Sequence, residues 1–305
     1  MIKVGLIGSG RKAEQQLELL TKAPDITLSG ITDEAFQDEA RRLAGEFRIP
    51  WVEQTEKLIQ QSDILDITCS GIYAFTSSVA AVKNFRHVYL HTGLSWELED
   101  IRLLSRLSLE AGVKVCVQNL KRTNKTFVAA RKYIGNPKFI EINLAESGSP
   151  GSEEAVSYRL CQCVDLLMAV NSDTIRRIQA HAVPMPDQTT GFLQSRFEYN
   201  NGCVATISYS RINGKPNDVL STYSEEGSLK VDFLNEIASF IPYPCTARRT
   251  VTGDAIQELN VAQAVRQIIS PTPGGTVLST INDLLLPQEI TRKILEKARL
   301  QLFHI

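Results

Sequence analysis

A glycine-rich turn near the start of the chain holds the densest group of residues suited to chemistry. The segment Gly8-Ser9-Gly10-Arg11-Lys12-Ala13 follows an apolar run, Ile2 to Ile7, and opens a helical pattern in the order G-x-G-x-x-A. The first glycine permits a tight turn, the second lets the backbone approach a pyrophosphate, and the small Ala13 allows close packing of helix on strand. A helix N-terminus offers free N–H groups to an anion, and Arg11 and Lys12 are cations that could also reach a phosphate. The motif predicts a dinucleotide-binding turn.

An acidic residue stands where such a site needs one. Asp33 lies 20 residues beyond Ala13, at the end of the predicted strand Ile26 to Thr32. A carboxylate there accepts hydrogen bonds from an adenosine ribose and repels a 2′-phosphate, which favours NAD over NADP. In the alternative interpretation the glycines only make a tight turn and Asp33 caps the next helix. The full order of strand, turn, helix, strand and acid favours the dinucleotide.

Short β-rich runs and longer helical patterns alternate over residues 1–119 and must position this turn. The predicted strands are residues 2–7, 26–32, 49–51, 64–68, 87–91 and 113–117; the predicted helices are residues 13–21, 35–47, 55–61, 75–84 and 97–111. This alternation is typical of a parallel sheet covered by helices on both faces. We therefore expect an α/β fold that begins with a doubly wound Rossmann domain.

The pattern changes after residue 119 to helices followed by alternating strands, as in an α+β domain. Residues 127–134, 153–169, 255–269 and 286–302 are predicted helices, and residues 139–146, 192–199, 203–210 and 228–233 are predicted strands. Asn200-Asn201-Gly202 is a strong hairpin signal. We expect a second domain over residues 120–305 with a mostly antiparallel, open sheet, and a last helix that packs back on the first domain.

Composition limits the possible partners. The chain has 305 residues, 33 Lys plus Arg, 34 Asp plus Glu and a formal net charge of −1. Balanced charge gives no general attraction to nucleic acid or to anionic lipid. No apolar run approaches the roughly 18 residues of a membrane span, and no signal-peptide pattern precedes the first strand. We expect a cytoplasmic protein whose partner is a small molecule.

The six cysteines are scattered along the chain at Cys69, Cys116, Cys161, Cys163, Cys203 and Cys245. Only Cys161 and Cys163 are close in sequence, and no second Cys or His cluster completes a tetrahedral ligand set. We expect reduced thiols and no metal.

These features together resemble the glucose-fructose oxidoreductase, inositol dehydrogenase and rhizopine catabolism (Gfo/Idh/MocA) family of NAD(P)-dependent oxidoreductases. The resemblance spans nearly the whole chain and includes the turn, Asp33, the segments 62–68, 87–90 and 111–115, Arg122 and the hairpin at 199–202. It implies hydride transfer to or from a sugar, polyol or related carbonyl compound. It also implies that Thr68 and Ser70 contact the cofactor and that the protein is a homodimer or homotetramer joined through the open sheet.

The chain departs from the family where protons are transferred. The family has a Glu-Lys-Pro tripeptide with an acid/base lysine, where this chain has His91-Thr92-Gly93. The family also has an Asp-x-x-x-His pair on a helix, and its positions align here with Tyr158 and Gln162. Alcohol oxidation needs a base, and proton transfer typically contributes 10² to 10⁴-fold in rate.

Three residues could replace the missing acid/base group. His91 lies at the carboxyl end of a central strand, Tyr158 could act if a neighbouring cation lowered its pKa, and Lys121 could turn toward the ligand. Thr92, Arg122 and Gln162 are candidates for positioning a substrate. Each candidate also has a structural interpretation as a residue that only supports the fold.

Two functions follow from these observations. One is an NAD-dependent oxidoreductase with an altered proton-transfer set. The other is a catalytically silent protein that senses a dinucleotide or a sugar-like ligand or partners an active enzyme.

Overall fold

A computed structural model of the chain describes residues 1–91, 96–118, 120–147, 153–185, 189–212, 214–244, 247–253, 260–271 and 278–302. The chain divides into two compact units. The first comprises Met1–Asn119 and Leu259–Leu285, and the second comprises Leu120–Glu258 and Leu286–Ile305.

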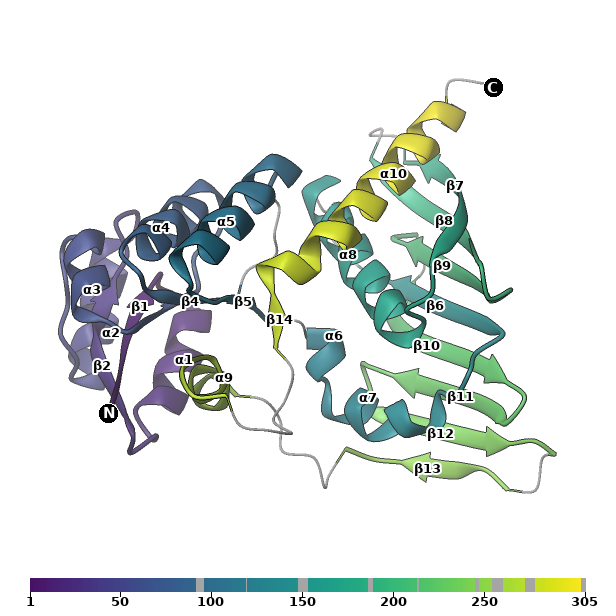
Figure 1. Ribbon diagram of the computed structural model, residues 1–305, viewed down its shortest axis with the longest axis horizontal. Coiled ribbons are helices and arrows are strands. Elements are labelled where there is room, and N and C mark those ends of the chain that lie inside the picture. The colour runs from purple at the N-terminus through teal and green to yellow at the C-terminus, as the bar shows by residue number, and fades with distance from the viewer. Residues whose placement is uncertain are drawn as a thin grey trace. The chain divides into compact units, whose positions relative to one another are not determined.

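The first unit is a six-stranded sheet between two layers of helices (Figure 1). Its strands are β1 (Ile2–Ile7), β2 (Ile26–Thr32), β3 (Ile64–Ile67), β4 (His87–Leu90), β5 (Val115–Val117) and β14 (Ser279–Thr280). Its helices are α1 (Arg11–Leu20), α2 (Gln37–Phe47), α3 (Thr55–Gln61), α4 (Gly71–Lys83), α5 (Leu98–Ala111), α9 (Val261–Ile269) and the 3₁₀ turn η2 (Ile281–Leu284). The spatial order is β14-β5-β4-β3-β1-β2, with only the edge strand β14 antiparallel to its neighbour.

Strand periodicity sorts the side chains of this sheet between its two faces. Val4 and Leu6 of β1 point to the face covered by α1, α2 and α9, while Ile7 points to the face covered by α3, α4 and α5. Side chains at residues 64 and 66, 89 and 91, and 116 and 118 share the α1 face by the same two-residue period. The carboxyl ends of the parallel strands therefore bring residues 66, 91 and 118 together under α1.

The second unit packs one face of an eight-stranded sheet against helices. Its strands are β6 (Phe139–Ala145), β7 (Ile175–Pro184), β8 (Thr190–Tyr199), β9 (Val204–Ser210), β10 (Asn217–Ser224), β11 (Gly227–Asp232), β12 (Ile237–Pro242) and β13 (Arg249–Val251). Its helices are α6 (Leu120–Thr123), α7 (Lys125–Ala130), η1 (Arg131–Tyr133), α8 (Glu153–Val170) and α10 (Leu285–Leu302). The order is β13-β12-β11-β10-β6-β9-β8-β7, and every pair except β6 with β9 is antiparallel.

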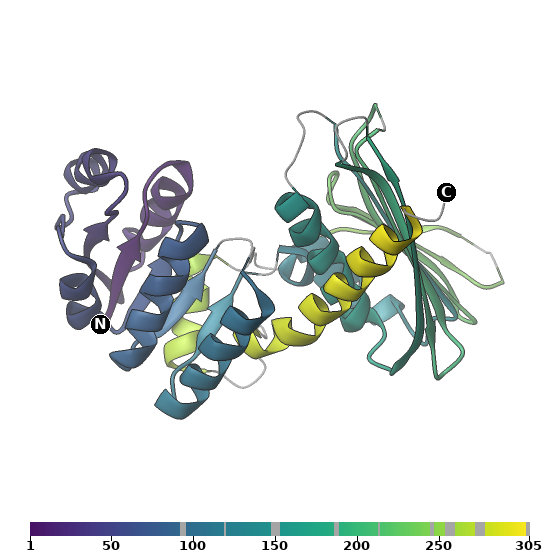
Figure 2. The ribbon, with the colours of Figure 1, turned by 90° about the horizontal axis from the view of Figure 1, so that it is seen from above.

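The core of the second unit lies between this sheet and α7, α8 and α10. The apolar stripe of α8, which recurs every three or four residues, is fully buried there: Val156, Leu160, Cys163, Val164 and Leu167. Figure 2 shows the sheet nearly edge-on, with α8 and α10 on one face and no described helix on the other. The expected hairpin is confirmed: β8 and β9 pair around Gly202, whose φ of 80° suits a glycine.

The structure differs from the sequence expectations at the domain boundary. A second domain of residues 120–305 was expected, yet residues 259–285 belong to the first unit, because α9 buries Val261, Ala264, Val265 and Ile268 against β1, β3 and β4. The last helix, expected to pack back on the first domain, instead buries Ile290, Ile294 and Ala298 in the core of the second unit. The predicted helix 255–269 corresponds to α9 (Val261–Ile269). Residues 254–259 lie outside the residues that the structure describes.

Some short elements also differ. The predicted strand at 49–51 is a single bridge between Ile31 and Trp51. The helix predicted from residue 75 begins at Gly71. Strands β7, β10, β12, β13 and β14 were not predicted, because their alternation is weak or their runs are short.

Candidate functional site in the first unit

The glycine-rich turn has the geometry that its sequence predicted. Gly8 has a φ of 117°, and a Cβ atom there would lie 2.6 Å from both the Cys69 nitrogen and Thr68 Oγ1. Gly10 has a φ of 81°, and a Cβ atom there would meet nothing within 4 Å. The first glycine is thus required by the neighbouring β3 loop, and the second leaves open space beside the backbone. Ala13 is fully buried between α1 and the sheet.

The N-terminus of α1 has no protein cap. Gly10 occupies the N-cap position and provides no side chain, and the helical hydrogen bonds start with Glu14 N donating to Gly10 O at 3.1 Å. The N–H groups of residues 11–13 are therefore those that a helix leaves for a ligand or water. With the helix dipole, they form a site suited to a phosphate group. Arg11, the first residue of the helix, is exposed beside them.

Asp33 has structural partners as well as a position suited to a ribose. Its Oδ2 accepts a hydrogen bond from Ser9 Oγ at 2.7 Å, which ties the end of β2 to the turn. Its Oδ1 accepts from the backbone nitrogens of Ala35 and Phe36, both at 3.1 Å. The side chain is 4% exposed. Asp33 therefore caps the loop before α2, and it also lies beside the glycine-rich turn.

Two exposed apolar side chains flank this end of the sheet. Phe36 follows the Asp33 loop and Ile72 begins α4, and they are 68% and 72% exposed. The two segments are in contact, since Tyr73 Oη accepts a hydrogen bond from Glu34 N at 3.3 Å. The two side chains leave apolar surface exposed beside the glycine-rich turn.

Thr68 and Ser70 lie in the loop between β3 and α4, next to the turn. Thr68 is buried, and its Oγ1 donates to Ile7 O at 3.4 Å. Ser70 is exposed at the N-cap position of α4, where its side chain makes no capping hydrogen bond. Ser70 is thus the more accessible of the two predicted cofactor contacts.

His91 is buried at the carboxyl end of β4, with both ring nitrogens facing oxygen atoms. Its Nε2 lies 2.5 Å from Asp66 Oδ1, and the two side chains are 1% and 0% exposed. Its Nδ1 lies 3.1 Å from Gln118 Oε1. The ring also packs edge-on against Tyr89, with 4.6 Å between the centroids. A ring enclosed in this way is held in position and does not extend into solvent.

Lys12 joins the same group from α1. Its Nζ donates to the His91 carbonyl oxygen and to Gln118 Oε1, both at 3.0 Å. Burial lowers the pKa of this amine, an effect partly offset by the nearby Asp66 carboxylate. The structure therefore directs Lys12, predicted as a phosphate contact, toward the ends of β4 and β5. We name Lys12, Asp66, His91 and Gln118 the edge quartet.

Sequence reasoning missed Asp66 and Gln118. Asp66 had a detectable signal, because a carboxylate stands within the apolar strand segment Ile64-Leu65-Asp66-Ile67 and is completely buried. A buried carboxylate requires a partner. Gln118 had no comparable signal, since it simply follows β5.

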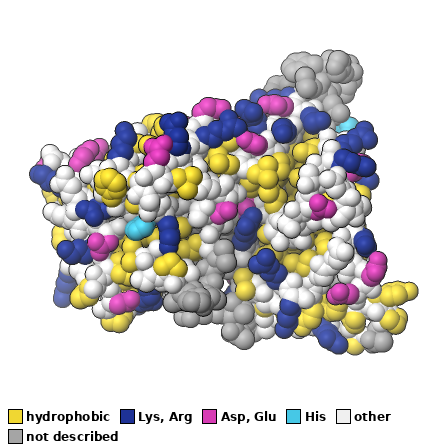
Figure 3. Space-filling view, viewed as in Figure 1, with side chains coloured by type: hydrophobic (Ala, Val, Ile, Leu, Met, Phe, Trp, Pro, Cys, Tyr) yellow, Lys and Arg dark blue, Asp and Glu magenta, His cyan; other side chains and the backbone are white. Residues whose placement is uncertain are grey.

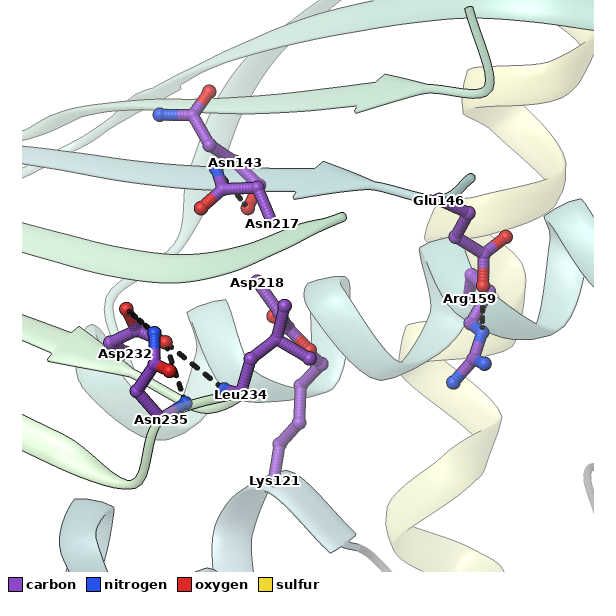
Figure 4. A network of polar contacts seen from close by, with 9 residues as sticks. All are labelled: Lys121, Asn143, Glu146, Arg159, Asn217, Asp218, Asp232, Leu234 and Asn235. Carbon is purple, nitrogen blue, oxygen red and sulfur yellow. Dashed lines mark hydrogen bonds and ion pairs between the residues drawn. The ribbon is translucent and has the colours of Figure 1, made fainter. Parts of the chain in front are cut away.

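Lys121 is committed to an ion pair inside the second unit. It is 5% exposed, its Nζ contacts Asp218 Oδ1, and it lies 4.7 Å from the centroid of the Phe233 ring. Figure 4 shows the side chain extending from α6 toward Asp218 at the start of β10. The expected turn of Lys121 toward a ligand would break this buried pair.

Arg122 pairs with a buried carboxylate of α8. Its Nε donates to Asp165 Oδ2 at 2.6 Å and its Nη2 lies 2.5 Å from Asp165 Oδ1. Asp165 is 1% exposed and Arg122 is 29% exposed. Because the bidentate pair neutralises the buried charge, Arg122 stabilises the fold of this unit, beside any role with a substrate.

Tyr158 and Gln162 contact each other one turn apart on α8. Gln162 Nε2 donates to Tyr158 Oη at 2.9 Å. Burial raises the pKa of Tyr158, and the opposing effect of Arg159 is smaller. An acid/base role for Tyr158 required a lowered pKa, so the surroundings of this residue oppose that role.

A second ion pair joins α8 to the sheet of the same unit. Arg159 Nε donates to Glu146 Oε1 at 2.8 Å, and Tyr209 Oη donates to Glu146 Oε2 at 3.0 Å. Figure 4 shows this pair beyond the end of β6.

The described cysteines Cys69, Cys116, Cys161, Cys163 and Cys203 are free thiols. Burial raises the pKa of Cys69, Cys116 and Cys161 to about 12, which makes these thiols poor nucleophiles at neutral pH. Among the residues with described positions, no cluster of three or more His, Cys, Asp or Glu could hold a metal ion. Thr92 and Cys245 lie outside the described residues.

Charges are mixed on the surface. Lys and Arg side chains alternate with Asp and Glu across the face in Figure 3, consistent with the net charge of −1. Within the described parts of the chain, none of the helices is both long and apolar enough to cross a membrane.

Comparison with known proteins identifies the fold. No protein-family model matches the chain, and no curated protein matches it by sequence. Solved structures do match. UDP-N-acetylglucosamine 3-dehydrogenase GnnA from Acidithiobacillus ferrooxidans superposes with a TM-score of 0.85 at 18% identity, over 97% of each chain.

Two further structures extend the comparison. A dehydrogenase (MviM) from Clostridium difficile gives a TM-score of 0.83 at 15% identity, over 97% of this chain and 99% of the other. Biliverdin reductase from Synechocystis sp. PCC 6803, solved with biliverdin and NADP+, gives 0.75 at 15% identity, over 97% and 98%. The chain thus has the fold of the Gfo/Idh/MocA-type dehydrogenases, as the sequence resemblance implied.

Proposed function

We propose that this protein is an NAD-dependent oxidoreductase of the Gfo/Idh/MocA type that transfers hydride to or from a sugar, a polyol or a related carbonyl compound. The observation that carries the proposal is the uncapped N-terminus of α1 behind Gly10, with the Asp33 carboxylate at the end of the neighbouring strand. This combination suits a pyrophosphate and an adenosine ribose.

The residues present fit a dinucleotide. The N–H groups of residues 11–13 would hold the pyrophosphate, and Asp33 would accept hydrogen bonds from the ribose after exchanging its contact with Ser9. The exposed side chains of Phe36 and Ile72 would contact the adenine. The bound nicotinamide would supply the hydride acceptor or donor. Thr68 and Ser70 border the same turn.

Charge supports NAD rather than NADP. Asp33 lies at the turn, so a 2′-phosphate on an adenosine ribose bound there would meet its carboxylate. No Lys or Arg donates a hydrogen bond to Asp33; its described donors are Ser9 Oγ and two backbone nitrogens.

The support for the substrate class is the fold likeness alone. GnnA is named as a dehydrogenase of UDP-N-acetylglucosamine and therefore acts on a sugar hydroxyl. A hydroxyl of a sugar, a polyol or a sugar nucleotide is the class to test first.

A second function, a catalytically silent binding protein, is favoured by the second unit. There Lys121 and Arg122 are occupied by Asp218 and Asp165, and the surroundings of Tyr158 raise its pKa. Such a protein would bind the dinucleotide or a sugar-like ligand without turnover.

One experiment separates the two functions. The protein is titrated with NADH and with NADPH by fluorescence, and then mixed with NAD+ and UDP-N-acetylglucosamine, glucose or myo-inositol while absorbance at 340 nm is followed. The enzyme requires binding and turnover. Binding without turnover of any compound supports the silent protein, and no binding of either nucleotide contradicts both.

We also propose a cytoplasmic homodimer or homotetramer joined through the uncovered sheet face. The free thiols support a reducing compartment. The uncovered face carries polar side chains such as Glu141, Asn143, Thr206 and Ser208, all partly exposed. Light scattering coupled to size exclusion would contradict the assembly if it gave a monomer mass.

A further inference from the structure

Lys12 is the one ionisable member of the edge quartet whose residue is not fully buried. Its residue is half-buried, whereas Asp66 and His91 are 0% and 5% exposed. An ammonium has three N–H donors. Two of them bond to His91 O and Gln118 Oε1, and among the described residues no third partner is present.

Lys12 differs from the other two cations considered for the site in its distance from the nearest carboxylate. Lys121 and Arg122 each contact a carboxylate at ion-pair distance. No carboxylate in the described part of the chain lies that close to Lys12, although Asp66 acts on it at longer range. An ion pair favours the charged form of an amine and burial opposes it, and for Lys12 the burial effect is the larger, so its pKa is lowered.

The quartet holds Lys12 through a defined pattern of donors and acceptors. A charged amine can only donate, so the Gln118 atom that faces it is the oxygen. His91 Nδ1 must then donate to that same oxygen. The other ring nitrogen, Nε2, lies 2.5 Å from Asp66 Oδ1. Asp66 thus orients His91, and His91 and Gln118 orient Lys12.

The strand order places Lys12 at one particular half of a dinucleotide. Asp33 follows β2, on one side of the turn, whereas His91 and Gln118 follow β4 and β5, on the other side. A dinucleotide with its ribose at Asp33 and its pyrophosphate at α1 extends its nicotinamide half toward β4. Lys12 reaches toward that side from the helix that binds the pyrophosphate.

We propose that Lys12 exchanges the proton of the substrate hydroxyl, with Asp66, His91 and Gln118 as positioning residues. In oxidation, the neutral Lys12 amine takes the hydroxyl proton and becomes ammonium, the C–H bond breaks as hydride passes to NAD+, and the carbonyl forms. The ammonium then releases its proton to water; reduction runs in reverse. This inference rests on the proposed oxidoreductase function.

Charge around Lys12 sets the direction of its pH dependence. The Asp66 carboxylate of β3 favours the ammonium form, and burial of Lys12, which is the larger effect, favours the neutral amine. His91 after β4 lies between Asp66 and Gln118. The net lowering of the Lys12 pKa lets the neutral amine form at a lower pH than in a lysine exposed to water. Oxidation should therefore rise with pH through the pKa of Lys12.

The test compares Lys12→Met and Lys12→Arg with a control, Lys22→Met, in which an exposed lysine just beyond α1 is replaced. Oxidation by NAD+ is measured on whichever of UDP-N-acetylglucosamine, glucose and myo-inositol the unaltered protein turns over fastest. A proton-transfer role predicts a 10² to 10⁴-fold fall in kcat for both Lys12 variants. NADH affinity should change less than about fivefold, and the alkaline rise in rate should disappear. Arg retains the charge but cannot release a proton, so rescue by Lys12→Arg would overturn the inference.

A second measurement needs no substrate. Protein labelled with [ε-¹³C]lysine is titrated with NADH and with ADP-ribose, and the Lys12 signal is assigned by its loss in Lys12→Met. A shift with NADH that ADP-ribose does not cause supports the position at the nicotinamide half. Equal shifts, or unchanged kcat in Lys12→Met, overturn the inference while the oxidoreductase function stands. Failure of the unaltered protein to bind NADH or to turn over any of these compounds overturns the proposed function and the inference with it.

Discussion

Asp33→Asn separates the two roles that the structure gives to Asp33. The carboxylate accepts three hydrogen bonds, two at Oδ1 from the Ala35 and Phe36 nitrogens and one at Oδ2 from Ser9. Asparagine keeps the Oδ1 acceptor, and the Ser9 hydroxyl can rotate to accept from the new Nδ2. Only the charge is lost, so we expect the free energy of unfolding to fall by about 1 kcal/mol.

NADH affinity should change much more. A hydrogen bond to a charged group contributes about 1.5 to 3 kcal/mol, which corresponds to a roughly 10- to 150-fold increase in Kd. The affinity of Asp33→Asn for NADPH should not fall in the same way, because the substitution removes an unfavourable contact between the carboxylate and the 2′-phosphate. The ratio of NADPH Kd to NADH Kd should therefore fall by about tenfold or more.

The assay is fluorescence titration of both nucleotides, with thermal denaturation as the stability measurement. Asp38→Asn is the matched control, since Asp38 lies on α2 with a fully exposed side chain. Asp33→Ala, which removes all three acceptor contacts, should lower Tm clearly below that of Asp33→Asn. The reasoning is refuted if Asp33→Asn binds NADH within about twofold of the unaltered protein. Asp33 would then only cap the loop before α2.

Three further predictions address stability. Gly8→Ala should lower the unfolding free energy by about 3 kcal/mol in urea titrations, because of its positive φ and the 2.6 Å contacts of the new Cβ. Gly45→Ala, in open space on α2, should raise that free energy by up to about 1 kcal/mol; equal effects of the two changes would contradict this view of the turn. Lys121→Met should cost about 3 to 5 kcal/mol by leaving Asp218 unpaired, and adding Asp218→Leu should recover most of it. If the double variant instead loses the sum of the unfolding free energies lost by the two single variants, Lys121 and Asp218 are not coupled. The Arg266 hydrogen bonds lower the pKa of Asp25 from 3.8 to about 2, so the pair stabilises the fold above the unfolded value and that contribution disappears as the pH falls from about 4 to 2. Carboxyl NMR titration should find the pKa of Asp25 near 4 in Arg266→Gln, and an unchanged value would exclude Arg266 as the cause.

The sequence predicted the five parallel strands of the first sheet because each contains buried apolar residues between helical patterns, whereas the two-residue edge strand β14 carries no such signal. Ile2–Ile7 and Ile26–Thr32 were located with their observed bounds, since buried parallel strands leave near-continuous apolar segments. The packing of α9 on the first unit could not be predicted, because an amphipathic pattern predicts a helix with one buried face but does not identify the sheet that covers this face. Its docking depends on contacts far apart in sequence, such as Arg266 with Asp25.

The glycine-rich turn could be predicted from the local sequence, whereas the edge quartet could not. The turn is local: Gly8, Gly10 and Ala13 act within six consecutive residues, so their spacing carries the signal. The quartet joins Lys12 to Gln118 across 106 residues and His91 to Gln118 across 27, and only the order of parallel strands makes them neighbours. Since β4 and β5 pair in parallel, residues one step past each strand meet at the same edge on the same face. When the lysine of a strand-end motif is absent, as at His91 after β4, another element can place a lysine at the same edge of the sheet, as α1 does with Lys12. The order of strands in the sheet, and not the order of residues in the sequence, therefore indicates where a replacement lies.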